Sequence, residues 1–142
     1  MILSAAEILK LLSNRRLNGR NLKSVVLISS ILSSNFGAKG QAIYGASKGA
    51  LEGFARAMAV ELAPNVRVNI ICPGGIPTPI GNIIINNQEL LKRSIDEGYL
   101  LGVGNTEYIA NAVEFLIGEK AEWITGQVMY VDGGKTSHLL GV

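Results

Sequence analysis

The chain has 142 residues, of which 48% are hydrophobic and 17% are charged, and its formal net charge is +2. This composition is that of a folded globular chain rather than a disordered one, and the small charge gives no reason to expect a nucleic-acid partner. No apolar run approaches the roughly 18 residues that a membrane span needs, so we expect no membrane partner.

The first third of the chain predicts a helix, a strand and a loop. Ser4 and Glu7 have the spacing of a capping box ahead of an apolar stripe, which predicts a helix over residues 4–12. The run Val25–Ile28 is short, continuous and mostly β-branched, and this pattern predicts a strand buried on both faces. Residues 31–41 are expected to form a loop in which the serines supply only polarity.

The rest of the chain continues the alternation of helices and strands. The expected elements are a helix over 42–63, a strand at Val66–Cys72, a short helix near 88–97 within the irregular segment 76–104, a helix at about 107–118 capped by Asn105 or Thr106, and a strand at Gln127–Val131. This order predicts an α/β fold in one domain over 1–142, with a parallel sheet and flanking helices. The single cysteine, Cys72, is typical of a reducing compartment, so we expect a cytoplasmic protein.

Residues that can carry chemistry follow two of the predicted strands. Ser29 and Ser30 follow the first strand and Pro73–Thr78 follows the second, and the carboxyl ends of parallel strands meet at one edge of a sheet. Tyr44 and Lys48 lie four residues apart on one helical face, where an ammonium group favours the phenolate form of tyrosine and so assists proton transfer. The pair alone is weak evidence, but with the two strand ends it predicts a catalytic site.

A family resemblance extends over nearly the whole chain. It is carried by Val26–Ser30, Gly40–Lys48, Arg67–Gly74, Ile109–Val113, Ile124–Val128 and Asp132–Gly134. In these segments the sequence resembles the short-chain dehydrogenase/reductase family, and it is most similar to bacterial 3-oxoacyl-carrier-protein reductases. The resemblance implies a Rossmann-like fold and an NAD(P)-dependent oxidoreductase that reduces carbonyls or oxidises alcohols by hydride transfer.

The resemblance also implies a role for each matching residue. Tyr44 would be the acid/base, Lys48 would assist Tyr44 and hold the nicotinamide ribose, and Ser30 would bind the substrate carbonyl. The family usually places its serine one residue closer to the tyrosine, which implies one inserted residue within 31–43 and leaves Ser29 as the alternative to Ser30. The nicotinamide would be contacted by Tyr44, Lys48, Pro73, Gly74, Ile76 and Thr78, with NADP or NAD as the cofactor.

One feature of the family is missing from the sequence. No G-x-G-x-x-G or T-G-x-x-x-G-x-G pattern occurs, so the resemblance implies a truncated Rossmann-like fold without its amino-terminal dinucleotide-binding half. We therefore expect little or no turnover from the isolated chain. The alternative function is a non-enzymatic oligomerising remnant or interaction module derived from such an enzyme.

The expected partners follow from the same reasoning. They are a small-molecule carbonyl or alcohol and either a second copy, packed through the helices at 4–12 and 42–63, or a separate amino-terminal half at the open edge of the strand at 25–29. Gly45, Gly49 and Gly53 recur every four residues, which would suit close packing by a second helix or by neighbouring backbone or cofactor. Asp132 is expected to cap a turn with Gly133–Gly134, His138 to lie on the surface, and no metal to bind.

Overall fold

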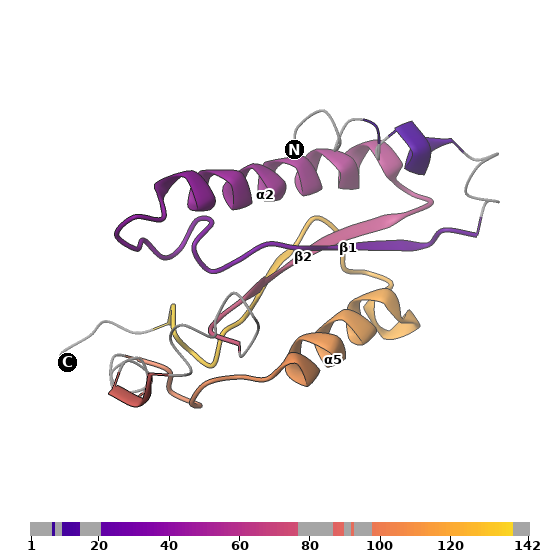
Figure 1. Cartoon of the computed structure of the whole chain (residues 1–142). Helices are drawn as coiled ribbons and strands as arrows, with labels where there is room; N and C mark the ends of the chain where they lie inside the picture. The colour runs from indigo at the N-terminus through magenta and orange to yellow at the C-terminus, as the bar shows by residue number, and fades with distance from the viewer. Residues whose placement is uncertain are drawn as a thin grey trace.

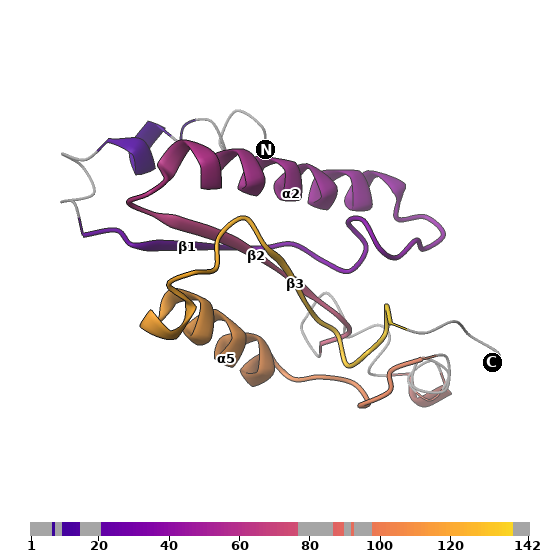
Figure 2. The same cartoon turned by 180° about the vertical axis from the view of Figure 1, so that it is seen from behind.

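The computed structural model describes residues 7, 10–14, 21–76, 87–89, 92 and 98–137. Its elements are β1 (Ser24–Ile28), α2 (Ala42–Leu62), β2 (Arg67–Pro73), α5 (Thr106–Ile117), the short 3-10 helix η1 (Glu119–Ala121) and β3 (Val128–Val131). Figures 1 and 2 label the strands and the two long helices. The three strands and the two long helices begin and end within one residue of the predicted bounds, so these predictions are confirmed.

The predictions for the two shorter helices fall mostly outside the described residues. Residues 7 and 10–13 are helical, in agreement with the helix expected at 4–12. Residues 88, 89 and 92 are helical within the range expected near 88–97. The remainder of both ranges lies outside the described residues.

The three strands form one parallel sheet in the order β1-β2-β3. The register pairs Leu27 with Ile70 and Cys72 with Tyr130. Helix α2 covers one face of this sheet and helix α5 covers the other, so that the molecule has three layers (Figures 1 and 2). This arrangement confirms the predicted α/β class, and it places the carboxyl ends of the strands at one edge.

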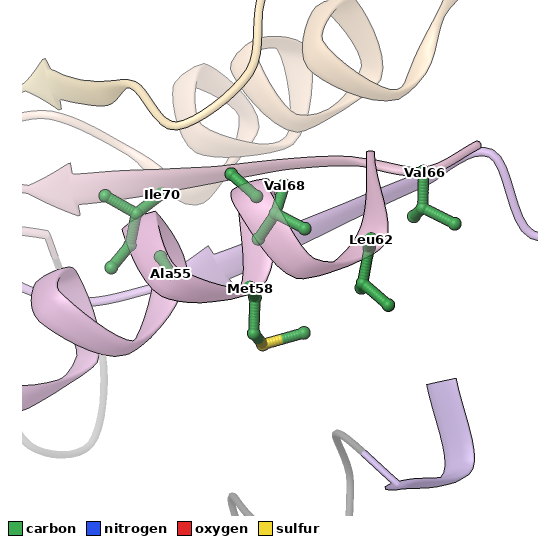
Figure 3. Packing of buried hydrophobic residues seen from close by; sticks show 7 residues of the cluster. Ala55, Met58, Leu62, Val66, Val68 and Ile70 are labelled. Atoms are coloured by element: carbon green, nitrogen blue, oxygen red, sulfur yellow. The ribbon is translucent and has the colours of Figure 1, made fainter. Parts of the chain in front are cut away.

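The central strand β2 contributes buried side chains to both faces of the sheet. On the α2 face, the apolar core consists of Ala55, Met58, Ala59, Leu62, Val66, Val68 and Ile70, most of which Figure 3 labels. On the α5 face, Ile71 packs with Leu116 and Ala121. This alternation of Ile70 and Ile71 follows from the two-residue period of a strand, because successive side chains point to opposite faces.

The prediction that the first strand is buried on both faces is wrong. Residues 24–27 of β1 are half-buried and Ile28 is exposed, whereas Val68–Cys72 of β2 is fully buried. Within the described residues β1 pairs only with β2, so it forms an edge of the sheet and is covered less completely. The apolar run therefore did not predict this exposure, whereas the open edge expected for the strand at 25–29 is present among the described strands.

Two polar side chains of β2 donate hydrogen bonds to carbonyl groups at the end of α5 and beyond it. The guanidinium of Arg67 donates to the Leu116 carbonyl at 2.6 Å and to the Gly118 carbonyl at 3.1 Å, where the end of α5 leaves carbonyls unpaired within the helix. Asn69 is fully buried, and its amide nitrogen donates to the Ile124 carbonyl at 2.8 Å. These bonds hold α5 and the connection to β3 against the sheet.

Asn105 caps the amino-terminal end of α5, and it is one of the two residues that the sequence offered for this role. The Asn105 side chain accepts the Tyr108 N–H at 3.0 Å, which satisfies one of the donors that the first turn of a helix leaves unpaired. None of the helices in the described ranges combines the length and the apolar character that crossing a membrane requires.

Candidate active site

The parallel hydrogen bonding continues beyond the ends of the strands. The Ile31 N–H donates to the Pro73 carbonyl at 3.1 Å, and the Gly74 N–H donates to the Val131 carbonyl at 3.0 Å. These bonds bring Ser30 and Pro73, which are 43 residues apart in the numbering, to the same edge of the sheet. The meeting of the two strand ends, expected from the α/β order, is therefore present.

Tyr44 and Lys48 lie at this same edge, on the first turns of α2. The Lys48 ammonium nitrogen is 5.7 Å from the centre of the Tyr44 ring and donates a hydrogen bond to the Ile28 carbonyl at 3.2 Å. The second contact ties the lysine to the carboxyl end of β1. Tyr44 is 38% exposed, so its ring can be reached from solvent. The spacing argument thus brought together the two residues correctly.

The two candidate serines have different surroundings. Ser29 is buried, and its hydroxyl donates to the Lys48 carbonyl at 3.0 Å. The Ser30 oxygen accepts the Leu32 N–H at 3.2 Å, an arrangement that uses a lone pair and leaves the hydroxyl proton available for a carbonyl oxygen. This difference supports Ser30, rather than Ser29, as the substrate-facing serine.

The glycines at the start of α2 allow the turn after β1 to lie directly against the helix. A β-carbon at Gly45 would be 2.7 Å from the Leu32 carbonyl oxygen, and one at Gly49 would be 3.2 Å from that of Ser33. Of the alternatives left open for these two glycines, the contacts favour close approach of neighbouring backbone over packing by a second helix. A β-carbon at Gly53 would have no neighbour within 4 Å in the described structure.

Sequence reasoning missed a buried carboxylate beside this turn. Glu52 is 3% exposed, and it accepts hydrogen bonds from the hydroxyls of Ser33 and Ser34, the latter at 3.0 and 3.1 Å to its two oxygens. Arg56, one helical turn further on, forms an ion pair with it at 3.5 Å. The prediction that the loop serines supply only polarity is thus wrong. The available signal was position, because Glu52 follows Tyr44 and Lys48 at further four-residue intervals on one helical face.

Cys72 lies beneath this carboxylate at the end of β2. Its sulfur is 3.6 Å from the Ser33 hydroxyl and 3.8 Å from a Glu52 oxygen, and the residue is fully buried. Burial raises the pKa of the Cys72 thiol above its usual 9.0, and the Glu52 charge raises it further, against a lowering by the Ser33 hydrogen bond. The thiol is therefore protonated at neutral pH and poorly reactive.

The segment after β2 lies close to the turn after β3 and to the side chain of Tyr99. A β-carbon at Gly74 would be 2.7 Å from the Asp132 α-carbon, and one at Gly75 would be 2.6 Å from the Tyr99 hydroxyl. The absence of a side chain at each position lets the chain after Pro73 lie directly against Asp132 and Tyr99. Ile76 is half-buried, and Thr78 lies outside the described residues.

Asp132 closes the turn after β3, as predicted. One carboxylate oxygen accepts the Gly134 N–H at 3.0 Å, and the other accepts the Thr136 N–H at 2.9 Å. In the part of the chain that the structure describes, no three side chains of the types that ligate metals lie together. His138 lies outside that part.

A lysine contacts two aromatic rings in the loops at the carboxyl ends of the strands. The Lys135 ammonium lies 5.3 Å from the centre of the Phe36 ring and 5.0 Å from that of Tyr99, so residues that follow all three strands meet there. Burial raises the pKa of the Tyr99 hydroxyl, and Asp132 raises it too, against a lowering by a backbone hydrogen bond from Gly75. A cavity of about 500 Å³ lies between the loop around Phe36 and the start of α2, next to Gly45.

Comparisons with known proteins establish the family. The family model described as enoyl-(acyl carrier protein) reductase matches residues 2–136. Tropinone reductase-like 3 from Erythroxylum coca is 40% identical over 116 residues, which are 82% of this chain and 45% of that protein. The 3-oxoacyl-(acyl-carrier-protein) reductase of Homo sapiens is 41% identical over 112 residues, which are 78% of this chain and 44% of that protein.

A solved structure gives the same result for the fold. A structure of 4-hydroxyisoleucine dehydrogenase complexed with NADH matches with a TM-score of 0.84 and 30% identity, over 97% of this chain and 55% of that one. The chain belongs to the short-chain dehydrogenase/reductase family. It spans about half the length of the curated relatives it matches.

Proposed function

We propose that this chain carries the catalytic residues of an NAD(P)-dependent oxidoreductase that reduces a carbonyl compound or oxidises the corresponding alcohol. One observation carries the proposal. The Lys48 ammonium stands 5.7 Å from the Tyr44 ring while it is hydrogen-bonded to the last carbonyl of β1, so helix α2 holds both side chains at the strand end that leads into Ser30. A proton donor, a cation and a hydroxyl at one edge suit charge that develops on a substrate oxygen.

The residues at this edge fit the reactive end of a nicotinamide cofactor. Gly74 and Gly75 let the chain after Pro73 lie directly against Asp132 and Tyr99, which fixes this backbone beside the proposed ring site, and Lys48 offers ammonium donors to ribose hydroxyls. Pro73 and Ile76 would line the ring, and Thr78 would contact its carboxamide. When bound, the nicotinamide supplies or accepts the hydride. Either NADP or NAD suits these residues.

Each catalytic side chain then has a defined task in carbonyl reduction. Ser30 donates its hydroxyl proton in a hydrogen bond to the substrate carbonyl oxygen and so fixes its position. Tyr44 transfers its phenolic proton to that oxygen as the hydride reaches the carbonyl carbon, which yields the alcohol and a phenolate. The Lys48 cation stabilises this phenolate until solvent returns the proton. Alcohol oxidation follows the same steps in reverse.

Calorimetric titration of the purified chain with NADPH and NADH tests this proposal. Lys48→Ala should weaken binding about tenfold to a hundredfold, because a hydrogen bond from a charged donor contributes roughly 1.5–3 kcal/mol. Lys120→Ala, at an exposed position, is the matched control and should bind as the unaltered chain does. Equal affinities for both variants would contradict the assignment of Lys48.

Turnover tests the assignment of Tyr44. We expect a low rate from the isolated chain, since its sequence has no glycine-rich dinucleotide motif to position the cofactor. In any preparation that reduces a carbonyl substrate, Tyr44→Phe should lower kcat by about 10²- to 10⁴-fold, which is the usual contribution of a positioned acid. Tyr108→Phe, which changes an exposed side chain on α5, should leave kcat unchanged. A rate that survives Tyr44→Phe would contradict the assignment of Tyr44 as the acid, whereas the lack of turnover in every preparation would favour the alternative of a non-enzymatic module.

The proposal includes a partner for the exposed face of α2. Val60 is 79% exposed on this helix, and Ile43 near its start is exposed as well. A second copy of the chain would cover such apolar side chains, and a separate amino-terminal half would instead pair with β1. Val60→Glu should reduce the molar mass measured by light scattering if copies pack through α2, and should leave it unchanged otherwise. A cytoplasmic location agrees with the buried, unpaired thiol of Cys72.

A further inference from the structure

The turn that carries Ser30 is attached to α2 at successive helical turns. The Ser29 hydroxyl donates to the Lys48 carbonyl at 3.0 Å, and the Ser33 carbonyl lies against Gly49. The Glu52 carboxylate accepts hydrogen bonds from the hydroxyls of Ser33 and Ser34. The turn therefore lies along the same stretch of helix that carries Tyr44 and Lys48. Any movement of the turn along this stretch would change the position of Ser30 relative to Tyr44.

Glu52 is the charged group in this attachment. Its two oxygens accept from Ser33 and Ser34, and Ser34 in turn lies 2.9 Å from the Tyr130 hydroxyl on β3. Arg56 balances its charge from the exposed side at 3.5 Å. A buried carboxylate is costly unless hydrogen bonds and a counter-charge compensate it, and both are present here. The carboxylate thus joins α2, the turn and β3.

Only Ser33 stands between the carboxylate and Ser30. The Ser33 N–H donates to the Ser30 carbonyl at 3.0 Å, and its hydroxyl lies within hydrogen-bond distance of both that carbonyl and Glu52. One hydroxyl proton serves one acceptor best, and the carboxylate is the stronger acceptor because it is charged. The carboxylate therefore sets the rotamer of Ser33, and the Ser33 backbone holds Ser30.

We propose that Glu52 is a positioning residue of this active site, which fixes the turn at Ser29–Ser34 through Ser33 and Ser34 and so sets Ser30 relative to Tyr44. The effect of Glu52 on catalysis rests on the proposed function, whereas its effect on the position of the turn does not. Among the described residues, no contact links Glu52 directly to the groups that would touch substrate, so its effect reaches them through the turn.

Amide hydrogen exchange measured by NMR on the 142-residue chain tests this role. The Leu32 N–H binds the Ser30 oxygen and the Ser33 N–H binds the Ser30 carbonyl, so both amides report on the position of Ser30. Glu52→Gln keeps the size but removes the charge, and should speed exchange at these amides about tenfold, as expected for the loss of a charge-assisted bond. Glu52→Met removes both acceptors and should have a larger effect. Glu61→Gln, exposed on the same helix, should change nothing.

Two results would overturn the proposal. One is unchanged exchange at Leu32 and Ser33 in Glu52→Gln. The other is an equal acceleration at the amides of α5, since this would show a general loss of stability instead of a local release. If Glu52→Met does not fold, Glu52→Gln and the single variant Ser34→Ala decide the question, with the same two amides as the readout.

A kinetic measurement separates this proposal from the oxidoreductase itself. In a preparation that turns over, Glu52→Gln should lower kcat about tenfold and leave the KM for NADPH unchanged, because Lys48 and Pro73–Gly74 are not displaced. A lowered kcat with a raised KM in equal measure would contradict a role confined to Ser30. A chain that binds neither NADPH nor NADH refutes the proposed function, while the exchange data still decide whether Glu52 fixes the turn.

Discussion

The two halves of helix α2 pack in different ways. The first half, 42–52, meets the turn after β1 through glycines, a lysine and a carboxylate. The second half contributes only apolar side chains to the core beside β2, among them Ala55 and Met58 (Figure 3). One helix thus supports the candidate site at its start and the hydrophobic core at its end.

This difference separates two kinds of consequence for a substitution. Contacts in the second half depend on the area of apolar surface removed from water, so their loss lowers the free energy of unfolding of the whole domain. Contacts in the first half are directional hydrogen bonds and close backbone approaches at one place. Their loss should displace the turn that carries Ser30 more than it lowers global stability. The predictions below test this division in order of expected size.

The largest effect is expected in the second half, at Met58. This side chain is 0% exposed, and Met58→Ala should lower the free energy of unfolding by about 2–5 kcal/mol, through lost burial and the cavity left behind. Urea denaturation followed by circular dichroism measures this change. The control is Val60→Ala, which lies on the same helix and is exposed, and its effect should be small. Equal losses from both variants would contradict the assignment of the core to this half.

A smaller and more local effect is expected at Gly45 in the first half. The new β-carbon of Gly45→Ala would be 2.7 Å from the Leu32 carbonyl oxygen, and because that atom belongs to the backbone, the turn must shift. We expect a cost of about 1–3 kcal/mol, reduced by the better helix propensity of alanine. NMR chemical shifts should change most in residues 30–34. Shift changes spread evenly over the core would show that the two halves are not separable in this way.

The same division explains what the sequence could predict. The bounds of α2 and the strands followed from local periodicity and from breakers such as Pro64, and Tyr44 and Lys48 followed from their spacing on one helix. The burial of Glu52 did not, because a glutamate on a helix is normally solvated and only the contact with Ser33 and Ser34 makes it otherwise. That contact joins segments 18 and 19 residues apart. The apolar run of β1 did not predict its partial exposure, because burial depends on the elements that cover a strand, whereas its open edge was expected from the family resemblance.

Alkaline pH should lower stability through two groups next to the site. The pKa values of Cys72 and Tyr99 are raised in the folded protein above their usual 9.0 and 10.0. At pH 7 both groups are protonated in the folded and unfolded states, so stability is unaffected. Above it the unfolded chain loses these protons first, and stability falls as pH rises, by at most about 1.4 kcal/mol per pH unit for each group.

Denaturation midpoints at pH 8, 9 and 10 measure this loss of stability. The same measurement on Cys72→Ala shows how much of the loss is due to the thiol. The variant should be less stable at pH 8 because it loses buried contacts, yet its stability should decline less steeply between pH 9 and 10. An identical slope in both proteins would mean that the thiol does not stay protonated in the folded state, and the close contact between β2 and the first half of α2 would then be in doubt.

The smallest effect is expected at Gly53, between the two halves. In the described structure a β-carbon there would have no neighbour within 4 Å, so Gly53→Ala should stabilise the chain by about 0.5–1 kcal/mol through helix propensity alone. Thermal unfolding of the dilute protein measures this gain, and the opposite sign expected for Gly45→Ala makes the two variants a matched pair. If a second copy approaches α2 closely at this point, alanine would instead weaken the assembly, and the gain would appear only where the chain is monomeric. The same substitution, followed against protein concentration, therefore shows whether the outer face of α2 at Gly53 faces solvent or another helix.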